Sequence, residues 1–427
     1  MSAHKRTIFL WALYDFANSV YPAVITATIF GVYFTRQIVG NETGLGDLWW
    51  GRVISVSMLF VALSSPSLGT IADRAGIRKR MLLFYTCLCV VCVTLFTTIQ
   101  PGMILWAVVL AVLANIGFEG ALVYYNAYLP DIAPTERQGS VSAIGFGFGY
   151  AGSAIGLLIA LPLVARGRFE LTWLTVAAFF VLFSLPSFLG LPPDRRTDTA
   201  IYRAAIEGII GFKKLGADVL RLRDLRRFLL AFFVYIDGVN TTIYFSAIFA
   251  SATLGFTDAE LISLFLVIQI SALVGALAMA KPTDLWGPKR VISMSLILWT
   301  TVSVSAYFVH SKALFFIIAV LAGMGLGVVQ AASRALMSAL IPEGKEAEMF
   351  GFYAFCGKSS SVIGPLVFGA VSYSLGGNQR AAIFSVAAFF LLGFILVQRV
   401  RDPLRAMQQS RTGELECVSS TPRNLER

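Results

Sequence analysis

Charged side chains are scarce in this chain. Of its 427 residues, 14% are Asp, Glu, Lys or Arg, 57% are hydrophobic, and the mean hydropathy is +0.75. Soluble domains usually carry about 25% charged residues. A chain so poor in charge cannot cover a water-facing surface, so the composition excludes an ordinary soluble protein and indicates a membrane protein.

Residues that support catalysis or cofactor binding are also scarce. The two histidines, His4 and His310, fall in the N-terminal tail and near a predicted membrane boundary. The five cysteines have no zinc-type spacing and no disulfide framework. The sequence has no Walker loop, dinucleotide fingerprint or nucleophile elbow. We therefore predict no enzyme activity, no cofactor and no metal.

Long apolar runs are what the sequence has in abundance. A membrane-spanning helix needs about 20 mainly apolar residues, and backbone polar groups must be satisfied inside lipid. The runs are too long and too uniformly apolar for barrel strands. The first run favours a retained helix over a cleavable signal peptide. We predict an all-α membrane protein of twelve helices, at 8-36, 50-72, 80-99, 103-128, 139-164, 171-192, 228-252, 259-281, 290-309, 313-338, 349-374 and 380-400.

The net charge of +10 is explained by the distribution of basic residues along the chain. Lys and Arg concentrate in alternate connections, which the positive-inside rule assigns to the cytoplasm together with both termini. The charge therefore indicates orientation and not a nucleic-acid partner. The basic segments on this side are Lys5-Arg6, Arg74 to Arg80, Arg195 to Arg227, Lys281 to Arg290 and the C-terminal arginines.

One long polar connection, 193-227, divides six predicted spans from six. Apolar residues at helical spacing within 201-225 alternate with Lys and Arg, which predicts an amphipathic helix on the cytoplasmic surface. The expected organisation is a six-helix bundle at 1-192, this linker, a second six-helix bundle at 228-402, and a polar cytoplasmic tail at 403-427.

The two halves repeat one another. Such a six-plus-six layout is that of a parallel-repeat transporter, whose substrate site lies near the membrane midplane between the halves. The matched positions are Asp73 with Asp284 (284 − 73 = 211), Pro130 with Pro342, Gly145 with Gly357 and Gly152 with Gly364 (each 212), and Asp15 with Asp237 (237 − 15 = 222).

The stretch Gly69-Thr-Ile-Ala-Asp73-Arg-Ala-Gly76-Ile-Arg78-Lys resembles the loop signature of the major facilitator superfamily. Its second copy has Ala280 in place of Gly69 and Leu285 in place of Arg74. The resemblance implies a latch between the cytoplasmic ends of the two halves in the outward-open state. The alternative is a tight turn whose basic residues only set topology. The predicted gating residues are Asp73, Arg74, Gly76, Arg78, Asp284, Lys289 and Arg290.

Four further stretches resemble the UMF1 branch of that superfamily, which includes bacterial permeases and the autophagy-related vacuolar amino-acid effluxers of fungi. The resemblance covers nearly the whole chain up to about residue 403 and implies an amino-acid transporter, with export from the cytosol across a bacterial plasma membrane. The stretches are Trp11-Ala-Leu-Tyr-Asp-Phe-Ala-Asn-Ser, Tyr125-Asn-Ala-Tyr-Leu-Pro, Tyr235-Ile-Asp-Gly-Val, and Gln330-Ala-Ala-Ser-Arg with Phe350-Gly-Phe-Tyr and Gly357-Lys358.

Polar and charged residues inside the predicted spans are the candidate site. A charged residue at the centre of a span costs about 2.5 to 3.5 kcal/mol, so each needs a partner or water. The set is mixed in sign and could hold a zwitterion, with its carboxylate near a cation and its ammonium near an acid. The candidates for substrate or proton binding are Asp15, Asn18, Tyr21, Glu119, Asn126, Asp237, Asn240, Tyr244, Gln330, Arg334 and Lys358.

Each charge also has a structural interpretation. Asp15 and Asp237 could be locked to a neighbouring helix by Asn or Tyr. Glu119 is a candidate proton carrier, because an apolar surround favours the neutral carboxyl, but it could equally form a structural salt bridge with Arg334. Lys358 could extend along its helix towards the cytoplasmic boundary.

These observations predict a monomeric secondary-active transporter that works by alternating access. Without a nucleotide-binding motif, its energy comes from gradients, and the interior carboxylates favour protons as the coupled ion. An alternative from another class is a lysolipid or amphiphile flippase or exporter on the same fold, with the charges at one end of the cavity and an aromatic wall beyond. A receptor or scaffold that uses the basic linker is a third hypothesis.

Overall fold

The computed structural model describes residues 3–40, 45–194, 219–360, 363–375 and 378–402, and within these ranges the regular structure is helical. The first half contains α1 (Ala3–Asn18), η1 (Pro22–Thr26), α2 (Ile29–Tyr33), η2 (Phe34–Val39), α3 (Leu45–Ala75), α4 (Arg78–Leu95), η3 (Phe96–Thr98), α5 (Ile104–Ala127), α6 (Leu129–Ile132), η4 (Thr135–Arg137), α7 (Gln138–Ala165) and α8 (Phe169–Gly190). The second half contains α11 (Arg223–Leu254), α12 (Asp258–Ala278), α13 (Ala280–Trp286), α14 (Pro288–Phe308), α15 (Lys312–Leu340), α16 (Glu346–Ser360), α17 (Ile363–Ser374) and α18 (Gln379–Gln398).

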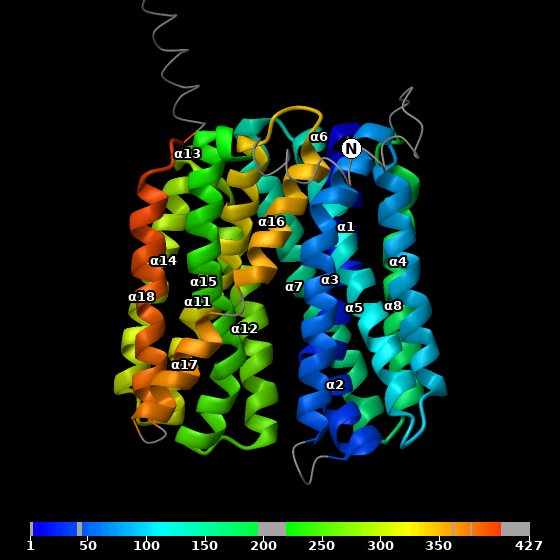
Figure 1. The fold of residues 1–427 in the computed structure, drawn as a ribbon, viewed down its shortest axis with the longest axis vertical. Coiled ribbons are helices and arrows are strands. Elements are labelled where there is room, and N and C mark those ends of the chain that lie inside the picture. The colour runs from blue at the N-terminus through cyan, green and yellow to red at the C-terminus, as the bar shows by residue number, and fades with distance from the viewer. Residues whose placement is uncertain (1–2, 41–44, 195–218, 361–362, 376–377, 403–427) are drawn as a thin grey trace, which may run out of the picture.

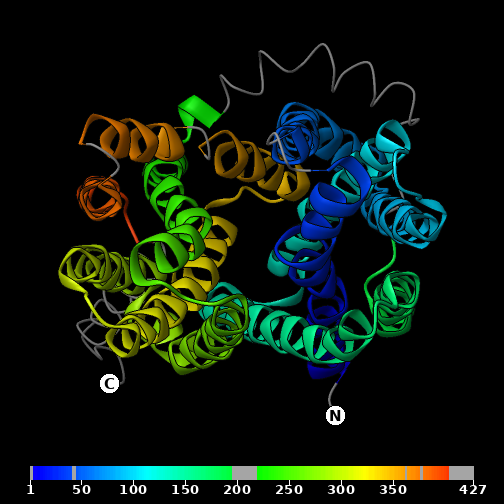
Figure 2. The ribbon, with the colours of Figure 1, turned by 90° about the horizontal axis from the view of Figure 1, so that it is seen from below.

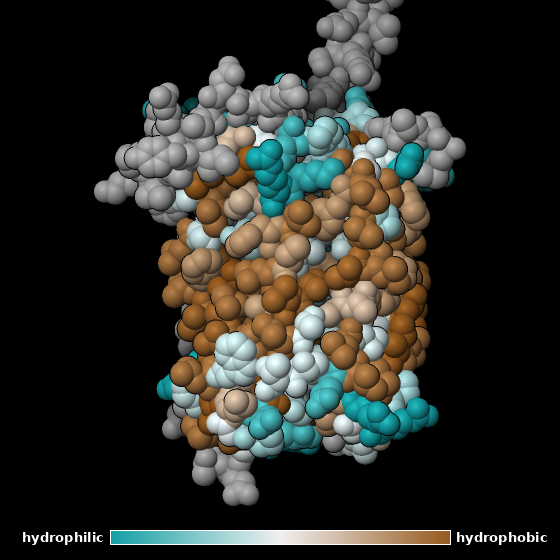
Figure 3. All heavy atoms as spheres, turned by 90° about the vertical axis from the view of Figure 1, so that its right-hand side faces the viewer, coloured by the Kyte–Doolittle hydropathy of each residue, from teal (hydrophilic) through white to brown (hydrophobic). Residues whose placement is uncertain are grey.

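The predicted all-α membrane fold is confirmed. Eleven helices among the described residues are long and apolar enough to cross a membrane. The remaining predicted span, 349-374, corresponds to α16 and α17, which lie on either side of two residues outside the described ranges. Figure 3 shows the consequence at the surface, where a belt of hydrophobic side chains separates two polar ends.

The first predicted span, 8-36, is not one regular helix. It is interrupted after α1, where a π-helical turn begins at Pro22 and the N–H of Ala27 donates to the Pro22 carbonyl. Proline lacks an N–H and its ring clashes with the preceding turn, so the α-helical ladder cannot pass through it unchanged. The chain still continues across the same layer as α2 and η2.

The helices gather into two groups, α1 to α8 and α11 to α18, which lie side by side (Figures 1 and 2). We call the end at which α1 begins and α18 ends the terminal face, which is uppermost in Figure 1, and the other end the opposite face. The groups meet where α3 and α5 pack on α16, and where α7 packs on α12, α13 and α15. The predicted linker helix at 201-225 falls largely outside the described residues, as does the tail at 403-427.

Candidate functional site

Arg334 on α15 reaches from the second group into the first. Its side chain is 2% exposed, and its guanidinium carbon lies 3.9 Å from the ring centre of Phe146 and 4.8 Å from that of Trp11. Nε donates to Ser142 Oγ at 2.9 Å, Nη2 to the Ser142 carbonyl at 2.6 Å, and Nη1 to Asn126 Oδ1 at 3.2 Å. Aromatic faces and fixed acceptors together replace the water that this cation has lost.

Asp15 completes this cluster. Its Oδ2 lies 3.5 Å from Arg334 Nη1, so the ion pair joins α1 to α15, and both side chains are buried. Breaking such a pair would leave one charge buried without compensation. The structure thus brings together the sequence-predicted Asp15, Asn126 and Arg334. It adds Ser142 and the rings of Trp11 and Phe146, which are not among the predicted site residues.

Glu119 pairs with Lys358 and not with Arg334, so the salt bridge considered from the sequence is wrong. Lys358 Nζ on α16 donates to Glu119 Oε1 on α5 at 2.7 Å, and the side chains are 28% and 7% exposed. Lys358 lies twelve residues from the start of α16 (358 − 346 = 12), a rise of about 18 Å. This lysine therefore ends in an ion pair at depth and does not extend to the terminal face.

The other predicted residues lie around these two ion pairs. Gln330 accepts a hydrogen bond from Tyr150 at 2.7 Å, which joins α15 to α7. Tyr21 is buried and stacks on Phe118 at 5.1 Å, next in sequence to Glu119. The remaining predicted residues are Asn18, buried beside Asp15 on α1; Asp237, buried on α11; Asn240, partly buried; and Tyr244, which is 51% exposed.

The first copy of the loop signature joins the two groups at the terminal face. The Asp73 carboxylate accepts hydrogen bonds from the backbone N–H groups of Ala347 at 3.2 Å and Glu348 at 2.9 Å, in the first turn of α16. The first N–H groups of a helix lack intrahelical acceptors, so a carboxylate there is favourable. Arg78 donates to Asp73 at 2.7 Å and forms an ion pair with Glu346.

Gly76 explains how the chain turns between these residues. Its φ of 63° lies in the left-handed region that favours glycine. The turn places Arg78 at the start of α4, where its third contact is Asp131 at 2.9 Å. Arg74, also predicted to gate, is exposed.

The second copy makes the corresponding contact. Asp284 accepts hydrogen bonds from the backbone N–H of Ser140 at 3.0 Å and from the Ser140 hydroxyl, at the start of α7. Helices α7 and α16 are equivalent in the repeat, so each acid caps the other group's matching helix, despite Leu285 and Ala280. Lys289 donates to the Gln398 carbonyl within its own group, and Arg290 is exposed.

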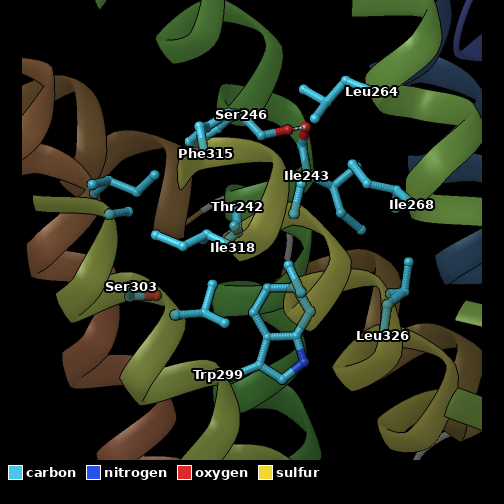
Figure 4. A pocket seen from close by; sticks show the side chains of 15 residues that line it. Thr242, Ile243, Ser246, Leu264, Ile268, Trp299, Ser303, Phe315, Ile318 and Leu326 are labelled. Atoms are coloured by element: carbon cyan, nitrogen blue, oxygen red, sulfur yellow. Dashed lines mark hydrogen bonds between the residues drawn. The ribbon is translucent and has the colours of Figure 1, made fainter. Parts of the chain in front are cut away.

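Two cavities accompany these contacts. One, of about 310 Å³, lies at the terminal face and is lined by Asp73, Arg78 and Asp131 among others. The other, of about 50 Å³, lies inside the second group (Figure 4), with Trp299 and Phe315 in its mainly apolar wall. The second cavity offers no charged partner to a polar solute.

Comparison with known proteins identifies relatives along almost the whole chain. The family model described as "Vacuole effluxer Atg22 like" matches residues 52–410. The MFS-type transporter YxiO of Bacillus subtilis is 32% identical over 404 residues, which cover 92% of this chain and 94% of that protein. Autophagy-related protein 22 of Kluyveromyces lactis is 24% identical over 376 residues, which cover 79% of this chain and 76% of that protein.

Solved structures show the same fold. The human organic anion transporter MFSD10 superimposes with a TM-score of 0.79 at 16% identity, over 93% of this chain and all of that one (100%). The proton:xylose symporter XylE does so with a TM-score of 0.70 at 12% identity, over 95% and 99%. These neighbours are transporters and not enzymes. The chain belongs to the Atg22-like family, the UMF1-type branch of the major facilitator superfamily of membrane transporters.

Proposed function

We propose that this transporter exports amino acids or similar small zwitterions, by alternating access and in exchange for protons. The observation that carries the proposal is the Glu119–Lys358 ion pair, which lies between the two groups and at depth. A zwitterion can replace both partners, since its carboxylate can accept from Lys358 while its ammonium donates to Glu119. The pair then serves as a stand-in for substrate when the site is empty.

The latches at the terminal face support alternating access. Asp73 and Asp284 each hold the start of a helix from the other group. With both termini in the cytoplasm, as the basic residues predict, this structure is the state closed to the cytoplasm. Reopening requires both acids to release their helices, which makes the terminal face a gate.

The proposal also specifies the coupled ion, which is the proton, and the direction of transport, which is efflux. Three carboxylates, those of Asp15, Glu119 and Asp237, are buried within the spans, where a proton can be taken up and released. The matching family model is described as a vacuole effluxer, which supports the transport of a solute, and export from the cytosol is our proposal for this chain. For this chain we propose a bacterial plasma membrane and a monomer.

The test is solute exchange in proteoliposomes that contain the purified protein. We expect counterflow of at least one radiolabelled amino acid, stimulated by a pH gradient. Glu119→Gln and Lys358→Met should each reduce it by about tenfold or more, since each removes a charge-assisted hydrogen bond to substrate. Absence of counterflow for every amino acid would contradict the proposal.

A matched control is available in the chain. Glu260 and Lys312 form a second Glu–Lys pair, at 2.7 Å, with side chains 37% and 39% exposed near the opposite face. Exposed pairs of this kind contribute little to stability. Glu260→Gln and Lys312→Met should therefore leave counterflow unchanged. This result would show that loss of counterflow depends on where the Glu–Lys pair lies and not on the substitutions themselves.

The apolar cavity of the second group favours one alternative function, the movement of amphiphiles. Its wall includes Ile243, Leu264 and Phe315, and an acyl chain would suit such a surface (Figure 4). The same liposomes distinguish the two functions. Binding and translocation of a labelled lysolipid, without amino-acid counterflow, would favour the amphiphile.

A further inference from the structure

Asp237 differs from the other two intramembrane carboxylates in having no cationic partner among the described residues. Asp237 is 1% exposed, and its Oδ2 accepts a hydrogen bond from the backbone N–H of Gly364 at 2.7 Å. Oδ1 is buried without a hydrogen-bond partner. One turn further along α11, Thr241 is fully buried and its Oγ1 likewise has no partner. Two orphaned oxygens on one helix face are costly inside a membrane.

These oxygens meet the start of α17. Gly364 is the second described residue of α17, and its N–H donates to Asp237 Oδ2. A Cβ at Gly364 would lie 2.7 Å from Asp237 Oδ1 and would overlap Thr241 Oγ1. Both orphaned oxygens therefore face the same small space beside the Gly364 backbone.

The repeat explains why Asp237 lacks the arginine that its counterpart Asp15 has. In this part of the chain the halves are offset by 212 residues, as Pro130 and Pro342 show. The position equivalent to Arg334 is therefore 334 − 212 = 122, which is Leu122. The first half supplies no cation where the second half supplies one.

Charged and titratable groups on the surrounding helices are engaged elsewhere. Arg334 on α15 is committed to Asp15, and Lys358 on α16 to Glu119. Of the described residues, none forms an ion pair with Asp237. Other groups on the elements packed against α11 include Tyr235 and Tyr244 on α11 itself, Tyr353 and Cys356 on α16, Arg380 on α18, which donates to the Val309 and Tyr307 carbonyls, and Glu260 on α12, which pairs with Lys312.

We propose that Asp237 is the residue that carries the coupling proton, and that its Oδ1 is protonated in this conformation. This inference rests on the transport function proposed above. A neutral carboxyl can keep the Gly364 hydrogen bond on one oxygen and carry its proton on the other, which faces the same space as Thr241 Oγ1. Neutralisation also removes the cost of an uncompensated buried charge. A metal cation fits poorly, because hard cations take six or more oxygens, whereas a backbone N–H already faces this carboxylate.

The first test reports protonation without any substrate. Infrared difference spectra of the purified protein near neutral pH should contain the carbonyl-stretch band of a protonated carboxyl. Asp237→Asn should remove the band, while Asp15→Asn should retain it. Thr241→Val should keep the band, because the proton belongs to Asp237. A native protein without the band, or a band that survives in Asp237→Asn, would overturn the proposal.

The second test reports coupling. In proteoliposomes, Asp237→Asn should make amino-acid transport independent of the pH gradient, whatever its absolute rate, while Glu260→Gln keeps the native dependence. Transport that a pH gradient still drives in Asp237→Asn contradicts the assignment of the coupling proton to Asp237. Transport that a Na⁺ gradient drives instead contradicts it as well. If the native protein shows no amino-acid counterflow, the proposed function fails, and the infrared result alone decides whether Asp237 is protonated.

Discussion

Burial of the Arg334 guanidinium inside the membrane is energetically costly, and its contacts join several helices. The cation is enclosed by the rings of Phe146 and Trp11 and by acceptors on Ser142 and Asn126. Gly145 makes room for it, since a Cβ there would lie 2.7 Å from its Nη2. Asp15, on α1 with Trp11, balances the charge. Four helices of the protein are thereby tied to one guanidinium.

We expect Arg334→Met to be among the most destabilising substitutions in the chain. It leaves Asp15 as a buried charge without a partner, which costs about 3–5 kcal/mol. Asp15→Asn should cost less, because the ring contacts and the Ser142 acceptors of Arg334 remain. Thermal unfolding in detergent measures both.

The double variant and a control complete this experiment. Asp15→Asn combined with Arg334→Met should be more stable than Arg334→Met alone, because no buried charge remains. Arg290→Met, at an exposed arginine, should leave the unfolding temperature unchanged. Losses in the two single variants that simply add would show that the two side chains do not interact.

The sequence predicted which residues matter at this scale better than it predicted their partners. The cost of charge in lipid is a property of composition and depth, so Asp15, Glu119 and Arg334 could be selected from the chain alone. Which acid meets which base depends on how the helices pack against one another, and small residues such as Gly145 decide that packing. For this reason the pairing of Glu119 with Arg334 was wrong.

At the scale of helices, the contact of α3 with α16 depends on small residues that let the backbones approach. A Cβ at Gly69 would overlap the Ala347 backbone, and one at Gly351 would lie 2.5 Å from the Ser65 carbonyl oxygen. This closeness brings Asp73 within hydrogen-bond distance of the first turn of α16. The glycines thus determine whether the latch can form.

Gly69→Ala should open the terminal face without altering any charge. The added methyl group displaces α16 and stretches the bonds from Asp73, so the terminal-face-open state becomes more populated. Labelling of a cysteine introduced at Gln138, which is buried in the first turn of α7 and belongs to neither latch, in a background without native cysteines, reports that opening. Gly51→Ala is the matched control on the same helix, because nothing lies within 4 Å of its Cβ. Equal labelling rates in both variants would refute this explanation.

Helices were predicted well where apolar length alone defines them, and poorly where they break. The span 8-36 was expected to be continuous, yet the chain is interrupted at Pro22. A proline in a membrane helix can be accommodated or can break it, and neighbouring helices decide between these outcomes. The hydrogen bond from the Gly364 N–H to Asp237, which matters for function, could not be predicted from apolar length.

On the scale of the whole molecule, the duplication provides two reciprocal latches and one asymmetric interior. Asp73 caps α16 and Asp284 caps α7, so closure of the terminal face follows the two-fold relation of the halves. The interior departs from it, since the partner of Asp15 is Arg334 and the equivalent of that arginine is Leu122. The contacts that close the terminal face are therefore related by the repeat, whereas the buried ion pair of Asp15 has no equivalent among the described residues of the other half.

The two latches should contribute unequally to closure. Asp73→Asn and Asp284→Asn each weaken hydrogen bonds to a charged group, worth about 1.5–3 kcal/mol, or roughly a ten- to hundredfold shift in a two-state equilibrium. We expect the larger shift for Asp73→Asn, because Arg78 loses an acid that also positions it against Glu346 and Asp131. The opposite face should close as the terminal face opens.

Spin labels at two exposed positions of the opposite face, Met103 in the first group and His310 in the second, measure this change. Their separation should shorten in the order native, Asp284→Asn, Asp73→Asn and the double variant, and the free-energy shifts of the two single variants should add, because the latches share no residue. A separation that responds to Asp73→Asn alone would mean that the second acid caps α7 without restraining the gate. In that case one latch closes the transporter, and its counterpart serves only to begin a helix.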